Sequence, residues 1–151
     1  MKLAEALQIR ADLQKRIAQM GSRLNANAIV QEGSEPAENT AELLKELEGM
    51  LTQHEQMVAR INLTNSTVTN GRGETITELI ARRDMLQTKV KMLRDLASAA
   101  SQKTDRYTLS EIRVISTVDV AETQRKVDEF SKRLREEDLA LQKLNWAIDL
   151  K

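Results

Sequence analysis

Apolar residues recur along the chain at alternating steps of three and four, in four separate segments. Such steps keep side chains on one seam of an α-helix. The seams fall within residues 3–24, 44–65, 76–100 and 120–148. Each predicts a helix of about 22 to 30 residues, which is long, because the mean helix of a globular protein has about 12.

The predicted seam residues, in the order of the four segments, are Leu3, Ala6, Arg10, Leu13, Ile17, Met20 and Leu24; Leu44, Leu47, Leu51, His54, Val58, Ile61 and Asn65; Ile76, Leu79, Arg83, Leu86, Val90, Leu93, Ala97 and Ala100; and Val120, Thr123, Val127, Phe130, Leu134, Glu137, Leu141, Leu144 and Ile148.

Turn and capping residues agree with these boundaries. Gly33 and Pro36 interrupt the chain in "VQEGSEP", and "TNGRGET" is a turn whose glycines tolerate positive φ. Asn39, Thr75 and Asp119 each precede a glutamate by three residues, which is the capping-box pattern at a helix start.

The segment 106–120, "RYTLSEIRVISTVDV", is rich in β-branched residues and does not share the helical period. It predicts an ordered arm or a short strand. Its apolar side chains need burial, on this chain or on a neighbour: Tyr107, Leu109, Ile112, Val114 and Ile115.

The pattern therefore predicts an all-α fold. Four long helices form antiparallel hairpins in a coiled-coil-like bundle, with a short extended arm between the third and fourth helices. At 151 residues the chain has the size of one domain, residues 1–151.

Composition narrows the function. Lys plus Arg and Asp plus Glu are both 23, so the chain lacks the positive charge of a general nucleic-acid binder. There is no cysteine, and no run approaches the roughly 18 apolar residues of a membrane span. The first 16 residues include Glu5 and Asp12 and do not have the pattern of a signal peptide. We expect a cytoplasmic protein with neither a nucleic-acid nor a membrane partner.

Two N-x-S/T sequons occur side by side, at Asn62 and Asn65. Glycosylation requires a secreted chain, so a structural role is expected. Asn is the best non-glycine residue for a left-handed helix stop, and Asn65 is the candidate, with Ser66 and Thr67 bonding the freed carbonyls. Asn62 would hold the following loop by its amide. The alternative is a polar hub that serves a ligand.

Several motifs together resemble the septicolysin-like family of small bacterial helical proteins. They are "NANAIVQEGSEPAE", "ARINLTNSTV", "TELIARRDML", "YTLSEIRVISTVDV" and "LNWAIDL", which span nearly the whole chain. The resemblance implies a small helical protein and supplies no catalytic residues. Cytolysis, which the family name suggests, finds no support in the residues, because aromatic content is only 2%.

The residues also argue against familiar catalytic and metal sites. His54 is the single histidine and lies on an apolar seam, and Val58 stands where a zinc-protease motif needs a second histidine. Glu32, Glu35 and Glu38 cluster before a helix, where they either bind a cation or interact with the helix dipole. His54 and these glutamates are the weak metal candidates, and no cofactor is expected.

Three charged residues interrupt the seams: Arg10, Arg83 and Glu137. If the helices run up and down in turn, all three fall in one layer. One reading is a buried Arg–Glu–Arg group that fixes the register of the helices. Another is an anion site held by the surplus positive charge. The alternative is that the arginines extend from a shallow seam to water.

The leading hypothesis is a structural or interaction protein, a helical module that assembles with copies of itself. Second apolar stripes support it, for example Leu7, Ala11 and Ala18, or Met85, Met92 and Leu96. The alternative is a helical bundle that binds a ligand or a metal at a subunit interface. Ligand candidates are Arg10, Arg83, Glu137, Asn62 and Asn65, and enzymatic activity is less expected than binding.

Overall fold

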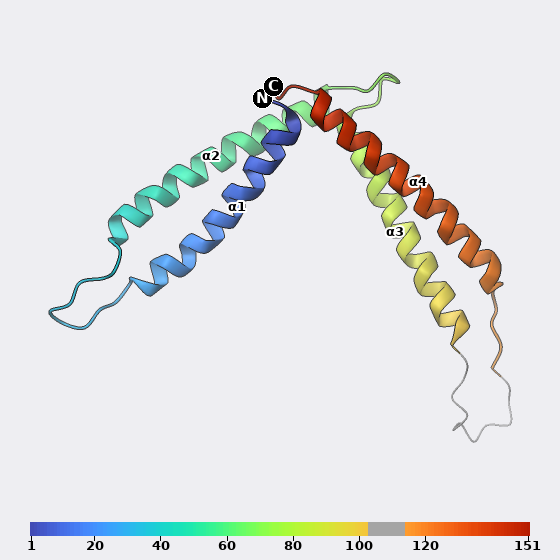
Figure 1. Ribbon diagram of the computed structural model, residues 1–151, viewed down its shortest axis with the longest axis horizontal. Helices are drawn as coiled ribbons and strands as arrows, with labels where there is room; N and C mark the ends of the chain where they lie inside the picture. The colour runs from blue at the N-terminus through green and yellow to red at the C-terminus, as the bar shows by residue number, and fades with distance from the viewer. Residues whose placement is uncertain (103–113) are drawn as a thin grey trace. The chain divides into compact units, whose positions relative to one another are not determined.

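The computed structural model describes residues 1–102 and 114–151, which contain four α-helices and no strand (Figure 1). The helices are α1 (Leu3–Ala26), α2 (Thr40–Thr67), α3 (Ile76–Ser101) and α4 (Val120–Ala147). The predicted all-α fold of four long helices is confirmed. Contacts divide the chain into two compact units, Met1–Ile76 with Gln142–Lys151, and Thr77–Leu141. The single domain over 1–151 stays a prediction beside this division.

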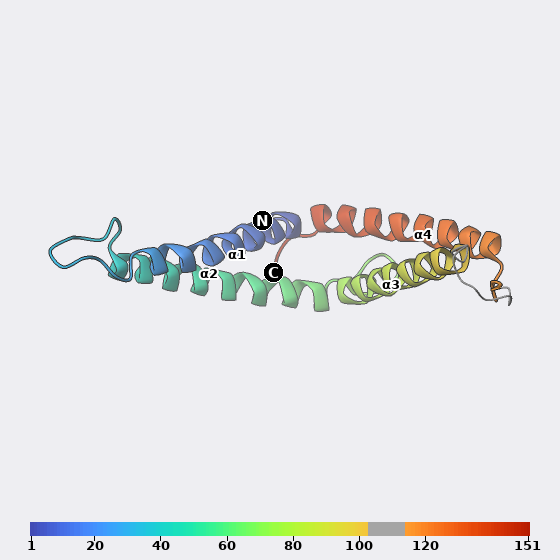
Figure 2. The ribbon, with the colours of Figure 1, turned by 90° about the horizontal axis from the view of Figure 1, so that it is seen from below.

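Helices α1 and α2 form an antiparallel hairpin and lie side by side (Figures 1 and 2). Leu13 and Met20 of α1 share a buried cluster with Leu43 and Met50 of α2. Ile17, Leu24 and Leu47 pack against this cluster. The buried residues of α1 are those of its predicted seam, so that seam is confirmed.

The predicted seam of α2 was partly wrong. The hairpin buries Leu43 and Met50, whereas Leu44 and Leu51 are 49% and 47% exposed. Leucines or methionines occupy both edges of this helix, so the apolar face is wider than one partner helix can cover. Helix α1 covers one edge and leaves the Leu44–Leu51 edge in solvent.

Side chains close the ends of α2. Asn39 caps the start, because its Oδ1 accepts hydrogen bonds from the backbone N–H groups of Ala41 (2.9 Å) and Glu42 (3.3 Å). At the other end the expected left-handed stop at Asn65 was wrong. The helix continues through Asn65 to Thr67, and no described non-glycine residue has positive φ. The hydroxyls of Ser66 and Thr67 donate to the Leu63 carbonyl, which lies within the helix and is not one of the carbonyls expected to be freed by a stop at Asn65.

A tight turn follows α2. The Asn70 side chain accepts from the backbone N–H groups of Arg72 (2.9 Å) and Glu74 (3.0 Å), and its amide donates to the Glu74 carboxylate. Gly73 has φ +80, which penalises any residue with a β-carbon. Thr69 and Thr75 form an antiparallel bridge across the turn.

The two ends of the sequence pair with each other in the same unit as the α1–α2 hairpin. Lys2 and Asp149 form an antiparallel bridge, and Lys2 Nζ lies 3.0 Å from Asp149 Oδ1. Lys151 then contacts α2: its N–H donates to Thr64 Oγ1 (3.0 Å), and its carbonyl accepts from Arg60 Nε (2.7 Å). Thr64 is fully buried beneath this contact.

Helices α3 and α4 form the second antiparallel pair. Lys89 Nζ lies 3.7 Å from the centre of the Phe130 ring, and Arg94 donates to Ser131 Oγ (3.2 Å). Leu79, Val90 and Ala97 of α3 are buried, as are Thr123, Val127 and Leu141 of α4, which confirms both predicted seams. Asp119 caps α4, because its carboxylate accepts from the Glu122 N–H (2.9 Å). Residues 114–119 are not helical, and Tyr107, Leu109 and Ile112 of the predicted arm lie outside the described residues.

Candidate interaction surface and polar sites

Arg10 of α1 and His54 of α2 lie at the same level of the α1–α2 hairpin. Arg16 pairs with Glu46 at 3.7 Å, and this antiparallel register places Arg10 level with His54. Arg10 Nε and His54 Nε2 are both shielded from solvent and have no hydrogen-bond partner in the described part of the chain. Buried polar atoms are nearly always paired, so each unpaired atom calls for an explanation.

Arg83 and Glu137 belong to the other unit, and each has ion partners there. Arg83 lies 2.7 Å from Asp84, without a well-directed N–H···O bond, and 3.5 Å from Asp138. Glu137 lies 3.9 Å from Arg82. Arg83 and Glu137 are therefore at one level of the α3–α4 pair. A common layer that also includes Arg10 stays a prediction.

Asn62 and Asn65 lie inside the last turns of α2. Asn62 is exposed and Asn65 is half-buried, and their amides make no hydrogen bond within the described ranges 1–102 and 114–151. The polar hub of this hairpin is instead Asn27, which is buried. A role for Asn62 or Asn65 in binding a ligand stays a prediction.

Asn27 was missed by the sequence analysis. Its Nδ2 donates to the Arg23 carbonyl (2.9 Å), and its Oδ1 accepts from the Glu38 N–H (2.9 Å), so one amide joins the end of α1 to the start of the next helix. Its backbone carbonyl accepts from Thr40 Oγ1 (3.4 Å). The available signal was an asparagine at a helix C-terminus, which commonly bonds freed carbonyls.

The three loop glutamates do not act together. Glu38 accepts hydrogen bonds from the Arg23 guanidinium, which lowers the pKa of its carboxyl group and raises the pKa of Arg23. Glu32 and Glu35 are exposed. Among the described residues no three His, Cys, Asp or Glu side chains are grouped as a metal site.

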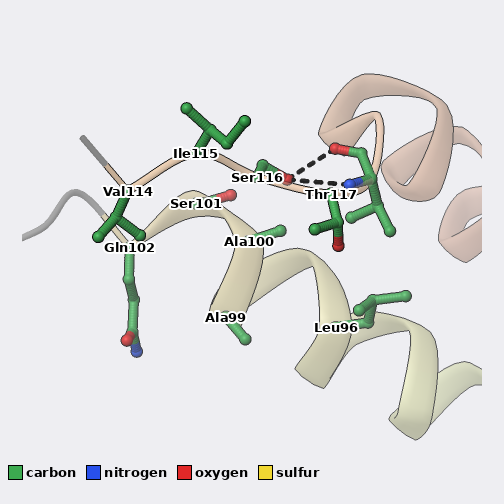
Figure 3. Close-up of a pocket in the computed structure, with 10 residues that line it drawn as sticks. Leu96, Ala99, Ala100, Ser101, Gln102, Val114, Ile115, Ser116 and Thr117 are labelled. Atoms are coloured by element: carbon green, nitrogen blue, oxygen red, sulfur yellow. Dashed lines mark hydrogen bonds between the residues drawn. The ribbon is translucent and has the colours of Figure 1, made fainter. Parts of the chain in front are cut away.

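An open hollow of about 420 Å³ lies at the end of α3 (Figure 3). Leu96, Ala99 and Ala100 of the helix line it, and Val114 and Ile115 close its other side. Ser116 is tied within its own segment by hydrogen bonds with both backbone groups of Val118. None of the described residues that line the hollow is ionisable. Val114 and Ile115 are exposed, and their expected burial against a neighbour stays a prediction.

The largest exposed apolar side chains on α3 form one stripe. Met85 and Met92 are seven residues apart and are 65% and 67% exposed, and Leu96 follows four residues later at 43%. Spacings of seven and four keep side chains on one face of a helix. We call Met85, Met92 and Leu96 the α3 stripe. It confirms that these residues form a second surface outside the helix pair.

Comparison with known proteins places this geometry in a family. A family model described as "Family of unknown function (DUF6847)" matches residues 10–150. The chain belongs to this family, DUF6847. A crystal structure of a functionally unknown conserved protein from Corynebacterium diphtheriae is also similar to it. The two chains are 40% identical with a TM-score of 0.93, over 100% of this chain and 99% of that one.

Neither similarity supplies an activity. No curated protein matches the sequence. Neither finding includes the septicolysin-like name, so that resemblance stays a prediction. No helix in the described residues combines the length and the apolar character that crossing a membrane requires.

Proposed function

We propose that this DUF6847 member is an assembly module that associates with copies of itself through exposed apolar helix faces. The α3 stripe carries the proposal, because two methionines about two-thirds exposed are placed one heptad apart. Side chains at this spacing pack into a facing helix as knobs into holes. Methionine also adapts well to an irregular partner surface.

The α2 edge adds a second face of the same kind. Leu44 and Leu51 are also seven residues apart, and each is about half exposed. We call Leu44 and Leu51, with the half-buried Val58 one heptad further on, the α2 stripe. Apolar side chains that recur on one exposed face of a helix in this way are suited to packing against another helix. Cytolytic activity is not part of the proposal, and a cytoplasmic location stays an expectation from the sequence.

Light scattering coupled to gel filtration tests the proposal. The wild-type protein at micromolar concentration is expected to have a mass that is a multiple of 17.1 kDa. Replacing both Met85 and Met92 by glutamate should reduce the mass to that of one chain, because four carboxylate oxygens would be buried without partners.

The matched control places the same charges elsewhere on α3. Gln87 and Ser98 are exposed and, at 3.6 residues per turn, point away from the α3 stripe. The Gln87→Glu, Ser98→Glu variant should keep the wild-type mass. A wild-type mass near 17.1 kDa would reject self-association altogether.

A further inference from the structure

The two helical hairpins have the same internal layout. The seams of α1 and α3 correspond residue for residue in spacing, and so do the buried seams of α2 and α4. The corresponding pairs of α1 and α3 are Leu3 and Ile76, Ala6 and Leu79, Arg10 and Arg83, Leu13 and Leu86, Ile17 and Val90, Met20 and Leu93, and Leu24 and Ala97. Those of α2 and α4 are Leu43 and Thr123, Leu47 and Val127, Met50 and Phe130, His54 and Leu134, Met57 and Glu137, Ile61 and Leu141, and Thr64 and Leu144.

Heptad spacing alone would not show that the two hairpins are repeats of one another, because many helices share it. The backbone hydrogen bonds at the ends of the helices also correspond. The Ile76 N–H donates to the Val68 carbonyl (3.3 Å) where α2 leads into α3. The Leu3 N–H donates to the Ile148 carbonyl (2.9 Å) where the end of α4 meets the start of α1. Ile76 and Leu3 are as far apart in number as the corresponding residues of α3 and α1, and Val68 and Ile148 are as far apart as those of α2 and α4. The two backbone bonds therefore join corresponding residues.

A second backbone bond and a bridge repeat in the same way. The Asn70 N–H donates to the Glu74 carbonyl (2.8 Å), and the Leu150 N–H donates to the Met1 carbonyl (2.9 Å). The bridge between Thr69 and Thr75 corresponds to the bridge between Asp149 and Lys2. The paired ends of the sequence thus have the hydrogen bonds of the Asn70–Glu74 turn, and the chain is a tandem repeat of one helical hairpin.

Because the hairpins correspond, the surroundings of Arg83 in the α3–α4 pair can be compared with those of Arg10 in the α1–α2 pair. Arg83 corresponds to Arg10 and has a carboxylate on each of two helices, Asp84 and Asp138. In the first repeat the corresponding residues are Ala11 and Val58. The same arginine therefore occurs in both hairpins, and only the second hairpin supplies its carboxylates.

Leu51 is exposed for a related reason. Its counterpart Ser131 is buried and accepts a hydrogen bond from Arg94 (3.2 Å). Gly21 corresponds to Arg94 and has no side chain to extend over Leu51. The first hairpin consequently has both an arginine without a carboxylate and an uncovered Leu51.

We propose that a carboxylate from a second copy of the chain completes Arg10, and that this carboxylate is Asp95, which lies beside the α3 stripe. The proposal rests on the self-association proposed above. Asp95 is exposed and three residues from Met92, so it is a neighbour of the stripe on one helix surface. The second copy's α3 thus offers apolar side chains to the α2 stripe and a carboxylate to Arg10.

The proposed contact would give a partner to nitrogen atoms of α1 and α2 that lack one. Arg10 Nε and His54 Nε2 are buried without partners in the part of the chain that the structure describes. An unpaired buried donor costs free energy, whereas an arginine–carboxylate bond is among the strongest polar contacts. In the second repeat Asp138 lies 3.5 Å from the Arg83 guanidinium as an ion partner, and a carboxylate delivered at this level would pair with Arg10 in the same way.

Sedimentation of two matched variants tests the proposal. Arg10→Met should weaken association at least tenfold in Kd and leave the urea midpoint of the dissociated chain unchanged or higher, because it removes a buried donor that has no partner within the described chain. Arg83→Met, at the corresponding position, should do the opposite: a lower midpoint and an unchanged Kd. Equal Kd values for wild type and Arg10→Met would overturn the proposal and leave self-association intact. A monomeric wild type would reject both.

Cross-linking identifies the carboxylate. Arg10→Lys keeps the charge and adds an amine that a zero-length carbodiimide joins to a carboxylate in direct contact. In a mixture of ¹⁴N- and ¹⁵N-labelled chains, the expected product links the amine at position 10 of one chain to Asp95 of the other. A link within one chain, or to a different carboxylate of the second copy, would overturn the assignment of Asp95.

Discussion

Asn27 joins two segments through one side-chain amide. Its Nδ2 and Oδ1 bond the Arg23 carbonyl and the Glu38 N–H, and the side chain is buried. Water therefore cannot replace these bonds without entering the end of the hairpin. Arg23 and Glu38, which Asn27 brings together, are also ion partners.

Asn27→Ala should lower the free energy of unfolding by about 1 kcal/mol, because the partly buried Glu38 N–H and Arg23 carbonyl lose their partner. Urea unfolding followed by circular dichroism measures the change. Asn62→Ala is the control: Asn62 is exposed, so its replacement should change stability by less than about 0.5 kcal/mol. Equal changes in stability for Asn27→Ala and Asn62→Ala would show that the hydrogen bonds of Asn27 do not stabilise the hairpin.

Asn65→Ala is expected to be neutral or stabilising by up to about 0.5 kcal/mol, because alanine has the higher helix propensity in a helix interior. A left-handed stop at Asn65 would instead make alanine costly, since its β-carbon is penalised there. Thermal melts of the two proteins distinguish these outcomes. A clear loss of stability would show that Asn65 makes a contact that the helix geometry does not require.

The Lys2–Asp149 pair should weaken in acid. The Lys2 ammonium hydrogen-bonds Asp149 and lowers the pKa of its carboxyl group below the ordinary 3.8. A carboxyl with a lowered folded pKa contributes its stability above its ordinary pKa and loses it as the pH falls through the folded value. Wild type and Asp149→Asn should differ in melting temperature at pH 7 and converge below about pH 3.8. Lys2→Met should keep part of its difference from wild type in acid, because the ammonium also donates to the Ala147 carbonyl (3.1 Å). A gap between wild type and Asp149→Asn that persists at low pH would count against the pair.

The elements were predictable because hydrophobic spacing is a strong signal over long helices. Three of the four seams follow from the sequence. The seam of α2 does not, because Leu43, Leu44, Met50 and Leu51 allow two seams, and only packing against α1 decides between them. The sequence also could not predict which carboxylates pair with Arg83. Several lie within one turn of α4, and Asp84 is adjacent to Arg83 in the sequence.

The repeat supplies a test of whether the α3 stripe serves folding or association. The counterparts of Met85, Met92 and Leu96 in α1 are Asp12, Gln19 and Arg23, and the fold of the first hairpin accepts them. Met85→Asp, Met92→Gln and Leu96→Arg together should therefore leave the helix content unchanged and abolish association. Circular dichroism and sedimentation measure the two properties. Loss of helix content would mean that the stripe is needed for folding.

At the scale of the molecule, the repeat predicts that the chain can be opened at its other junction. A permuted gene would begin at Gly73, continue through Lys151, add Arg-Gly, and then run from Met1 to Arg72. The added residues correspond to Arg72 and Gly73, so the new glycine can adopt the positive φ found in the turn. Circular permutation succeeds at exposed turns of this kind.

The permuted protein should keep its helix content and melt within about 4 °C of wild type, the shift that 1 kcal/mol causes at this size. The control opens the chain between Gln87 and Thr88, inside α3, and should melt far lower because it interrupts a helix. Equal losses in both permuted proteins would show that the two junctions are not equivalent.

The pairing of Met1 with Leu150 also determines how the protein responds to mechanical force. Handles attached to the two ends of the sequence would load the bonds of Lys151 to Thr64 and Arg60 first. The Leu150–Met1 and Leu3–Ile148 backbone bonds would then open one after the other. Loading bonds in sequence requires less force than shearing many in parallel. Stretched from these ends, the protein should first yield in a small, low-force step that frees the terminal residues before α1 separates from α2.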